Sequence, residues 1–159
     1  MIEVKNVIKS FDGKTVLHDI NATFHKGKTN LIIGQSGSGK TVMMKSLVGL
    51  LKPETGEILF DGRDITKMTI KQMKEIRKEM GMLFQGSALF DSETVLGNVM
   101  FPLKMFSDMS YEEQLERAHF CIDRVNLKDA DDKYPAEISG GMQKRVAIAR
   151  AIALNPTYL

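Results

Sequence analysis

The stretch Gly34-Gln35-Ser36-Gly37-Ser38-Gly39-Lys40-Thr41 decides which fold this sequence favours. The residues before it, 29–33, end in an apolar run that predicts a buried β-strand. The residues after it, from Val42 onward, carry apolar side chains at helical spacing. A glycine-rich turn that joins a strand to a helix is the local context of a phosphate-binding loop.

The residue types in this loop suit the phosphate groups of a nucleotide. Gly34, Gly37 and Gly39 allow the backbone to turn successive N–H groups inward. The helix that follows adds unpaired N–H groups and the positive end of its dipole. We expect Lys40 to reach the β- and γ-phosphates and the Thr41 hydroxyl to contact Mg²⁺. The loop therefore predicts binding of a nucleoside triphosphate.

Length, charge and cysteine content limit the class of protein. A chain of 159 residues can bury one sizeable core, with room for a small subdomain. The formal net charge of +2 gives no support for a nucleic-acid partner. The single cysteine excludes a disulfide framework and fits a reducing cytosol. No apolar run approaches the length of a membrane span, so we expect no direct membrane insertion.

Further strands are predicted on both sides of the loop. Apolar and polar residues alternate over 2–8 and loosely over 17–24, and Asp12-Gly13 predicts the hairpin turn between them. Residues 57–60 predict a short strand, and 82–84 predict a second buried strand. Together with the helical patterns these strands predict an α/β fold.

Helices are predicted where apolar residues recur at helical spacing next to capping residues. The first predicted helix ends at Lys52-Pro53. Thr69 and Gln72 predict a capping box for a helix with Ile70, Met73, Ile76 and Met80 on one side, and Ser110 and Glu113 predict another box. A helix over 94–106 is expected to break at Pro102.

A second glycine-containing stretch, Ile138-Ser139-Gly140-Gly141-Met142-Gln143, precedes a helix predicted from Val146 to Leu154. Ser139 suits the N-cap, and two glycines allow a helix N-terminus to approach an anion closely. A helix cap with a flexible entry explains the same residues equally well when they are considered alone. Their combination with the loop at 34–41 and with Gln85 favours the anion site.

At this point the chain resembles the nucleotide-binding subunit of an ATP-binding cassette (ABC) transporter. By resemblance, 34–41 is the Walker A loop, Gln85 is the Q-loop glutamine, and 138–142 is the signature motif. The resemblance implies a P-loop NTPase core with an antiparallel β subdomain over 1–85. It also implies a helical subdomain over 86–138, followed by the signature motif and its helix over 139–159.

The resemblance also assigns residue roles. Lys40 and Gln85 would act in catalysis, and Thr41 and Gln85 would hold Mg²⁺. The expected ATP-binding residues are Phe11, Val16, Gly34, Gln35, Ser36, Gly37, Ser38, Gly39, Lys40 and Thr41, with Ser139, Gly140 and Gly141 contributed in trans. Phe11 falls where the family places an aromatic ring against adenine, although a Phe there is also a plausible core residue.

The family works as a head-to-tail dimer that holds ATP between its subunits. The resemblance therefore implies a homodimer, with a membrane permease docked on the segment 86–138. It places the chain in the cytoplasm, peripheral on the inner face of the cell membrane.

The segment 81–90 and Met142 are similar to the ATPases of lipid-trafficking systems of the maintenance-of-lipid-asymmetry type. Those ATPases work with a permease and a mammalian-cell-entry substrate-binding protein. Ile138 and Met142 stand where the wider family usually has Leu and Gln, which leaves the role of Gln143 open. Phospholipid is the substrate that this branch implies, and another substrate class remains open.

The sequence printed here stops at Tyr158-Leu159, where the resemblance expects the Walker B strand to begin. The family's Walker B Asp, its catalytic Glu and its switch His would follow. We therefore expect an incomplete cassette that binds nucleotide and hydrolyses it negligibly, because charge stabilisation at the phosphate is lost. Without that central strand, marginal stability or non-native association is also expected.

Two other functions remain as alternatives. The first is a soluble ABC-type ATPase that acts on ribosomes or DNA, which the near-neutral charge disfavours. The second is a phosphate-loop kinase or nucleotide-binding module unrelated to transport. It would leave Gln85 and 139–141 without a role.

Overall fold

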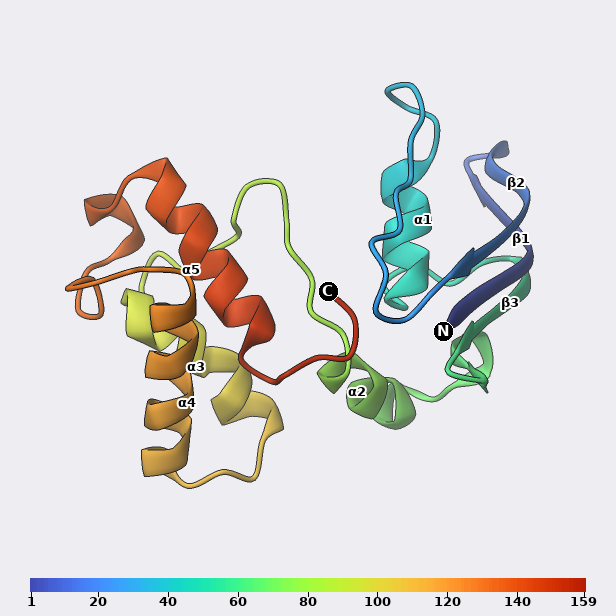
Figure 1. Cartoon of the computed structure of the whole chain (residues 1–159). Coiled ribbons are helices and arrows are strands. Elements are labelled where there is room, and N and C mark those ends of the chain that lie inside the picture. The colour runs from blue at the N-terminus through green and yellow to red at the C-terminus, as the bar shows by residue number, and fades with distance from the viewer. The chain divides into compact units, whose positions relative to one another are not determined.

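The computed structural model describes residues 1–159 and contains two compact units, Met1–Arg77 and Lys78–Leu159. The first unit holds all the strands of the sheet together with two α-helices and a short 3-10 helix, and the second is built from helices and loops (Figure 1). The division at Arg77 reflects packing. The subdomain limits at 85 and 138 stay predictions.

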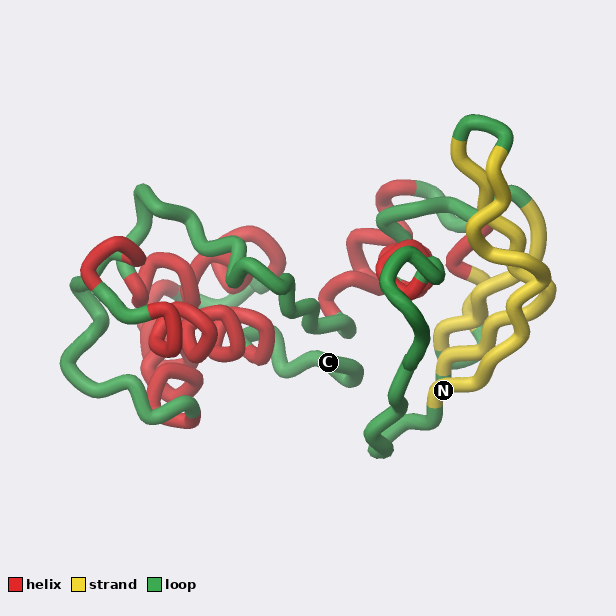
Figure 2. Tube along the Cα trace, turned by 90° about the horizontal axis from the view of Figure 1, so that it is seen from above, coloured by secondary structure: helices red, strands yellow, loops and turns green.

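The first unit is built on an antiparallel sheet, which Figure 2 shows in yellow. Its strands are β1 (Ile2–Phe11), β2 (Lys14–Phe24), β3 (Thr55–Phe60) and β4 (Arg63–Asp64), in the spatial order β2-β1-β3-β4. The predicted hairpin is confirmed, because Phe11 pairs with Lys14 across the turn. Asp12 and Gly13 adopt φ values of 48° and 78°, as a two-residue type I′ turn requires.

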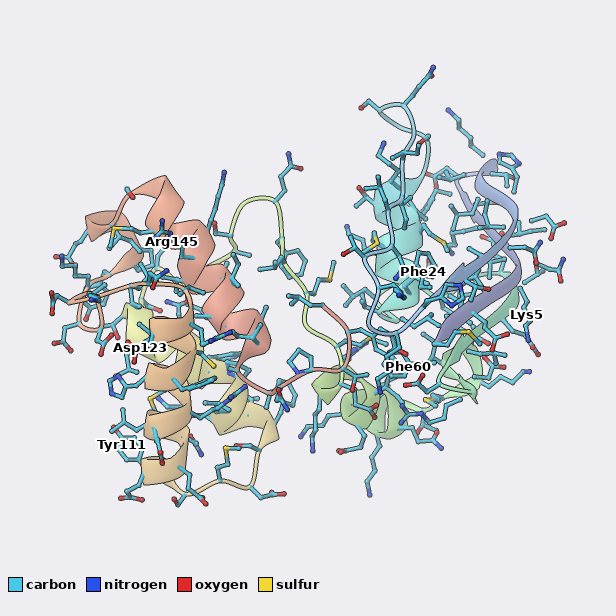
Figure 3. All side chains as sticks on the ribbon, viewed as in Figure 1. Lys5, Phe24, Phe60, Tyr111, Asp123 and Arg145 are labelled. Carbon is cyan, nitrogen blue, oxygen red and sulfur yellow. The ribbon has the colours of Figure 1, made fainter.

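The helices of this unit are α1 (Lys40–Leu47), the short 3-10 helix η1 (Ile65–Lys67) and α2 (Ile70–Lys78). α1 lies beside the sheet and contacts β2 (Figure 1). The buried residues of this unit include Val4, Val7, Met43, Leu47, Ile58 and Phe60, the last of which is labelled in Figure 3. The unit therefore has a core of its own, formed by β1, β3 and the inner face of α1.

The two predicted buried strands are wrong. Residues 29–33 and 82–84 form no strand, and the side chains of Leu31 and Ile33 are 81% and 80% exposed. A buried strand needs neighbours on both sides to satisfy its N–H and C=O groups. The sheet contains only β1 to β4, and none of these strands pairs with either run. The second unit has one isolated parallel bridge, between Met80 and Tyr158.

α1 ends earlier than predicted. Gly49 adopts φ 66°, its N–H donates to the carbonyl of Ser46, and the N–H of Leu50 donates to that of Lys45 at 2.8 Å. This pair of bonds is a Schellman motif, in which a left-handed glycine closes the helix. The helix therefore stops at Leu47, before the proline at 53 that was expected to end it.

The second unit packs α3 (Val95–Phe106), α4 (Tyr111–Arg124) and α5 (Gly140–Ile152) against one another (Figure 1, Figure 2). The short 3-10 helix η2 (Pro135–Glu137) precedes α5. The core includes Val99, Leu103, Ala118, Ile122, Val146 and Ala149, all of which are 2% exposed or less. Tyr111 and Asp123, near the two ends of α4, and Arg145 on α5 are labelled in Figure 3.

Both predicted capping boxes are confirmed, at Thr69 with Gln72 and at Ser110 with Glu113. Two details of the helix predictions are wrong. Ile70 is 89% exposed, because it is the first residue of α2 and does not share the buried stripe of Met73 and Ile76.

The predicted break at Pro102 is the other error. α3 continues through this residue, although a proline inside a helix costs about 3 kcal/mol. Val99 and Leu103 on either side are completely buried in the core of the unit. Burial of these apolar side chains offsets the lost backbone hydrogen bond.

Candidate functional site

The loop at 34–41 folds tightly onto the start of α1. The Ser38 N–H donates to the Gln35 carbonyl at 3.2 Å, and Gly37 and Gly39 have φ values of 79° and 91°. A Cβ atom added at Gly34 would lie 2.6 Å from the Ser38 Oγ. Left-handed backbone geometry therefore favours glycine at 37 and 39, whereas a side chain at 34 would require only the Ser38 hydroxyl to rotate.

The N-terminus of α1 differs from that of the helices in the second unit. Its N-cap, Gly39, makes no side-chain hydrogen bond, whereas Thr94, Ser110 and Ser139 cap α3, α4 and α5 with their hydroxyl groups. The first N–H groups of α1 thus receive no side-chain acceptor. A helix end of this kind is an anion-binding site by virtue of its N–H groups and its dipole.

Lys40 holds its ammonium group over the same loop. Its Nζ donates to the carbonyl oxygens of Gly34 and Gln35, at 2.8 and 2.7 Å. Thr41 follows it in the first turn of α1 and is exposed. Backbone donors, a lysine cation and a hydroxyl group therefore lie within one short segment, which is the chemistry that phosphate and Mg²⁺ recognition uses.

Val16 and Phe11 belong to the hairpin of β1 and β2. A Cβ atom at Gly39 would lie 3.1 Å from the Val16 carbonyl oxygen and 3.2 Å from its Cγ1, so β2 packs against the loop. Phe11 lies at the end of β1 and is 41% exposed, with the Nζ of Lys9 5.2 Å from the centre of its ring. The structure brings Val16 to the phosphate loop and leaves the Phe11 ring accessible at the end of its strand.

Gln85 lies in the second unit, in a loop that precedes α3. The Ser87 N–H donates to the Phe84 carbonyl at 3.1 Å, which closes a turn with Gln85 and Gly86 at its centre. The Gln85 side chain is exposed. The tight turn therefore exposes the amide group of Gln85 to solvent.

The stretch at 139–141 opens α5. The Ser139 Oγ accepts a hydrogen bond from the Met142 N–H at 3.3 Å, which confirms Ser139 as the N-cap. Gly140 and Gly141 are exposed, and a Cβ at Gly140 would meet nothing within 4 Å. Packing within this chain therefore does not explain a glycine at 140. Gln143 has a structural role, because its Nε2 donates to the Pro135 carbonyl at 2.8 Å.

Two polar residues of the second unit were not predicted from the sequence. Asn98 on α3 and Arg150 on α5 donate hydrogen bonds to the backbone of the segment that follows Gln85. Burial lowers the pKa of Arg150 from its ordinary value. The one available signal was an arginine within the apolar helix predicted from Val146 to Leu154.

The chain contains no group of three or more His, Cys, Asp or Glu residues positioned to hold a metal ion. No helix combines the length and apolar character that a transmembrane segment needs.

Comparison with known proteins places these features in a family. The family model described as ABC transporter matches residues 17–159. The chain is 41% identical to the intermembrane phospholipid transport system ATP-binding protein MlaF of Haemophilus influenzae, over all of this chain and 60% of MlaF. It is 41% identical to the probable ribonucleotide transport ATP-binding protein mkl of Mycobacterium leprae, over 99% of this chain and 46% of mkl.

A third relative, the methionine import ATP-binding protein MetN of Corynebacterium jeikeium, is 40% identical over 99% of this chain and 44% of MetN. The chain thus spans about half the length of these relatives.

Solved structures agree with the family. The dimeric structure of MJ0796, described as a bacterial ABC transporter cassette, matches with a TM-score of 0.90 and 36% identity, over 98% of this chain and 71% of that one. A post-hydrolysis state of MJ0796 bound to ADP and Pi matches with a TM-score of 0.89. The α/β P-loop fold predicted from the sequence is therefore confirmed, and the chain belongs to the ABC transporter family.

Proposed function

We propose that this chain is the nucleotide-binding part of an ATPase that energises transport through a membrane permease. The observation that carries the proposal is the loop 34–41, which closes on an uncapped helix N-terminus and holds the Lys40 ammonium above its own carbonyls. Family membership supports the same function. The relatives' names add ATP binding and transport.

The chain's own residues suggest how ATP is bound. Lys40 would exchange its two neutral carbonyl acceptors for charged phosphate oxygens, which accept stronger hydrogen bonds. The first N–H groups of α1 would donate to the same phosphates. The exposed ring of Phe11 offers a face on which adenine can stack, with Val16 against the loop beside it.

Magnesium would be held mainly by the phosphates. The residues that we assign to it, Thr41 and Gln85, offer a hydroxyl and an amide oxygen, the hard ligands that Mg²⁺ prefers. When bound, the ion would neutralise charge on the β- and γ-phosphates.

We further propose that two copies pair head to tail, with ATP between them. The N-terminus of α5 supports this assembly, because it presents exposed glycines that packing in this chain does not require. A helix N-terminus brought to the γ-phosphate from a second copy would stabilise its negative charge. The two MJ0796 structures, both described as dimeric, support pairing of two copies.

A permease would dock on the second unit and keep the protein at the cytoplasmic face of a membrane. Apolar side chains are exposed there, including Phe90 and Phe101, whose ring centres lie 4.5 Å apart, and Met105. Phospholipid is our proposed substrate, with a mammalian-cell-entry protein as a further partner, on the strength of the similarity to MlaF. The names of mkl and MetN keep another substrate class as an alternative.

The test compares this 159-residue chain with the full-length gene product. We expect the full-length product to hydrolyse ATP and to retain a permease in a pull-down, and the 159-residue chain to bind nucleotide with little turnover. Retention of ribosomes or DNA in place of a permease would favour the soluble ATPase. Turnover by the short chain at the rate of the full-length product would overturn the assignment of the catalytic residues.

A further inference from the structure

Arg150 donates hydrogen bonds to the backbone of the segment that follows Gln85. Its Nη2 donates to the Ser87 carbonyl at 2.9 Å and its Nη1 to the Ala88 carbonyl at 2.8 Å. The guanidinium carbon lies 5.7 Å from the centre of the Phe90 ring. The planar fork of an arginine suits two adjacent acceptors, and a lysine cannot reproduce this geometry.

Asn98 holds the same segment from α3. Its side chain is completely buried, and its Oδ1 accepts from the Phe90 N–H at 2.8 Å. Its Nδ2 donates to the Phe90 carbonyl at 3.1 Å and also to the carbonyls of Glu93 and Thr94. Every polar atom of this amide is therefore used on the loop between Gln85 and α3.

The backbone of Ser87 and Ala88, which Arg150 contacts, has an unfavourable conformation. Ser87 and Ala88 have φ values of 61° and 49°, a left-handed region that residues with a side chain rarely adopt. Such a conformation persists only where the surrounding structure holds it. Ser87 also closes the turn that presents Gln85, through its hydrogen bond to Phe84. Loss of the contacts that fix Ser87 should therefore also move Gln85.

We propose that Arg150 and Asn98 are positioning residues that fix the Gln85 turn and tie it to α5. This proposal rests on the proposed function, which assigns Gln85 and Ser139 to the ATP site. α5 follows its N-cap Ser139 and carries Arg150 in its last turn, so one helix joins the glycine stretch to the segment after Gln85. Binding of a nucleotide at Ser139 would then affect the position of Gln85, because α5 and Arg150 connect the two residues.

Arg117 provides a matched control. Its Nε and Nη2 donate to the carbonyls of Ala153 and Ile152, both at 2.9 Å, and its guanidinium lies 5.1 Å from the centre of the Phe120 ring. It therefore makes the same kinds of contact as Arg150, with two backbone carbonyls and one aromatic ring, but it does so from α4. Its hydrogen bonds go to the end of α5 instead of the segment after Gln85.

The first experiment measures hydrogen–deuterium exchange in this 159-residue chain and in its Arg150→Lys, Arg150→Met and Arg117→Met variants. We expect exchange in peptides covering 84–90 to rise by about tenfold in Arg150→Met and to stay at the wild-type rate in Arg117→Met. Arg150→Lys should lie between them and serves as the second variant if Arg150→Met does not fold. Equal exchange at 84–90 in all variants would overturn the proposal.

The second experiment measures ATP hydrolysis by the full-length product with the same substitutions. We expect Arg150→Met to lower kcat by about tenfold or more while KM changes little, because misplacement of Gln85 affects the reaction after ATP is bound. Arg117→Met should keep kcat at similar thermal stability. An equal loss of kcat in both variants would contradict the positioning role. Failure of the wild-type product to hydrolyse ATP would count against the proposed function, and the exchange experiment would still decide the positioning of the turn.

Discussion

The Nζ of Lys40 lies 2.7 Å from the carbonyl oxygen of Gln35, so the cation of the phosphate loop is held by the loop itself. This contact keeps the positive charge beside the backbone donors of α1 before any anion arrives. A preorganised cation loses little conformational freedom when it binds, which favours affinity.

Substitution of Lys40 tests the nucleotide site directly. We expect Lys40→Met to weaken binding of a fluorescent ATP analogue by about tenfold or more, because a charged hydrogen bond contributes about 1.5–3 kcal/mol. Lys45→Met is the control, since Lys45 is an exposed lysine of the same helix. Equal affinity of the two variants would contradict the placement of the site.

Gly34→Ala tests the close packing within the loop. The new Cβ would lie 2.6 Å from the Ser38 Oγ but 3.5 Å from the Ser38 Cβ. We therefore expect Gly34→Ala to lower the free energy of unfolding by about 1 kcal/mol or less, because the exposed Ser38 hydroxyl can rotate to another rotamer. Adding Ser38→Ala should restore most of that loss, because it removes the clashing oxygen. Urea unfolding of the single and double variants measures the effect, and a double variant no more stable than Gly34→Ala would show that another contact is responsible.

Phe11→Ala tests the stacking of adenine. One base on one aromatic ring contributes about 1–3 kcal/mol, so ATP affinity should fall by that amount while affinity for inorganic triphosphate stays the same. Phe11→Tyr keeps an aromatic face and should bind ATP like the wild type. Titration calorimetry with both ligands makes the comparison, and an equal loss for both would show that Phe11 does not stack on the base.

The dependence of stability on pH can be tested at Asp64. Burial raises the pKa of this carboxyl, but hydrogen bonds from Lys67 and Thr66 outweigh it, and the pKa is lowered. A lowered folded-state pKa means that the stabilisation is present above the unfolded pKa and is lost as the pH falls through the folded one.

Asp64→Asn retains an oxygen that can cap η1 and removes the charge next to Lys67. The wild type should be more stable than this variant at pH 7, by about 1 kcal/mol or less, because the lysine is largely exposed. The difference should shrink as the pH falls below the ordinary range of an aspartate. Urea unfolding across that range makes the measurement, and a difference independent of pH would rule out a role for the charge.

Features determined by neighbouring residues could be predicted from the sequence. The hairpin turn at Asp12-Gly13 and the box at Ser110 depend on interactions within three or four residues. The glycine loop is predictable for the same reason, since its φ values and its lysine lie within one short stretch. Each of these signals stays the same whatever surrounds it.

Features that depend on distant residues could not be predicted in this way. The apolar run that contains Leu31 and Ile33 predicts a buried strand. Burial of a strand requires neighbouring strands, and no strand of the sheet pairs with these residues. Pro102 was expected to break α3, but packing on both sides keeps the helix intact. The role of Arg150 depends on carbonyl groups more than 60 residues away in sequence, which no local pattern encodes.

The final prediction concerns the exposed glycine at the start of α5. A Cβ at Gly140 meets nothing within 4 Å, so both Gly140→Ala and Gly140→Asp should fold. An aspartate in the first turn should even stabilise α5 by about 0.3–1 kcal/mol through the helix dipole. The same carboxylate would face the γ-phosphate of ATP bound to a second copy and repel it.

We therefore expect the full-length Gly140→Asp variant to bind ATP as a monomer and to lose ATP-dependent dimerisation, while Gly140→Ala still dimerises. Sedimentation velocity with and without ATP, next to thermal unfolding of both variants, separates assembly from stability. Dimerisation of Gly140→Asp at the ATP concentration that dimerises the wild-type protein would show that this helix end does not approach the nucleotide. Because the aspartate variant is expected to be at least as stable as the wild type, its failure to dimerise could not be explained by unfolding.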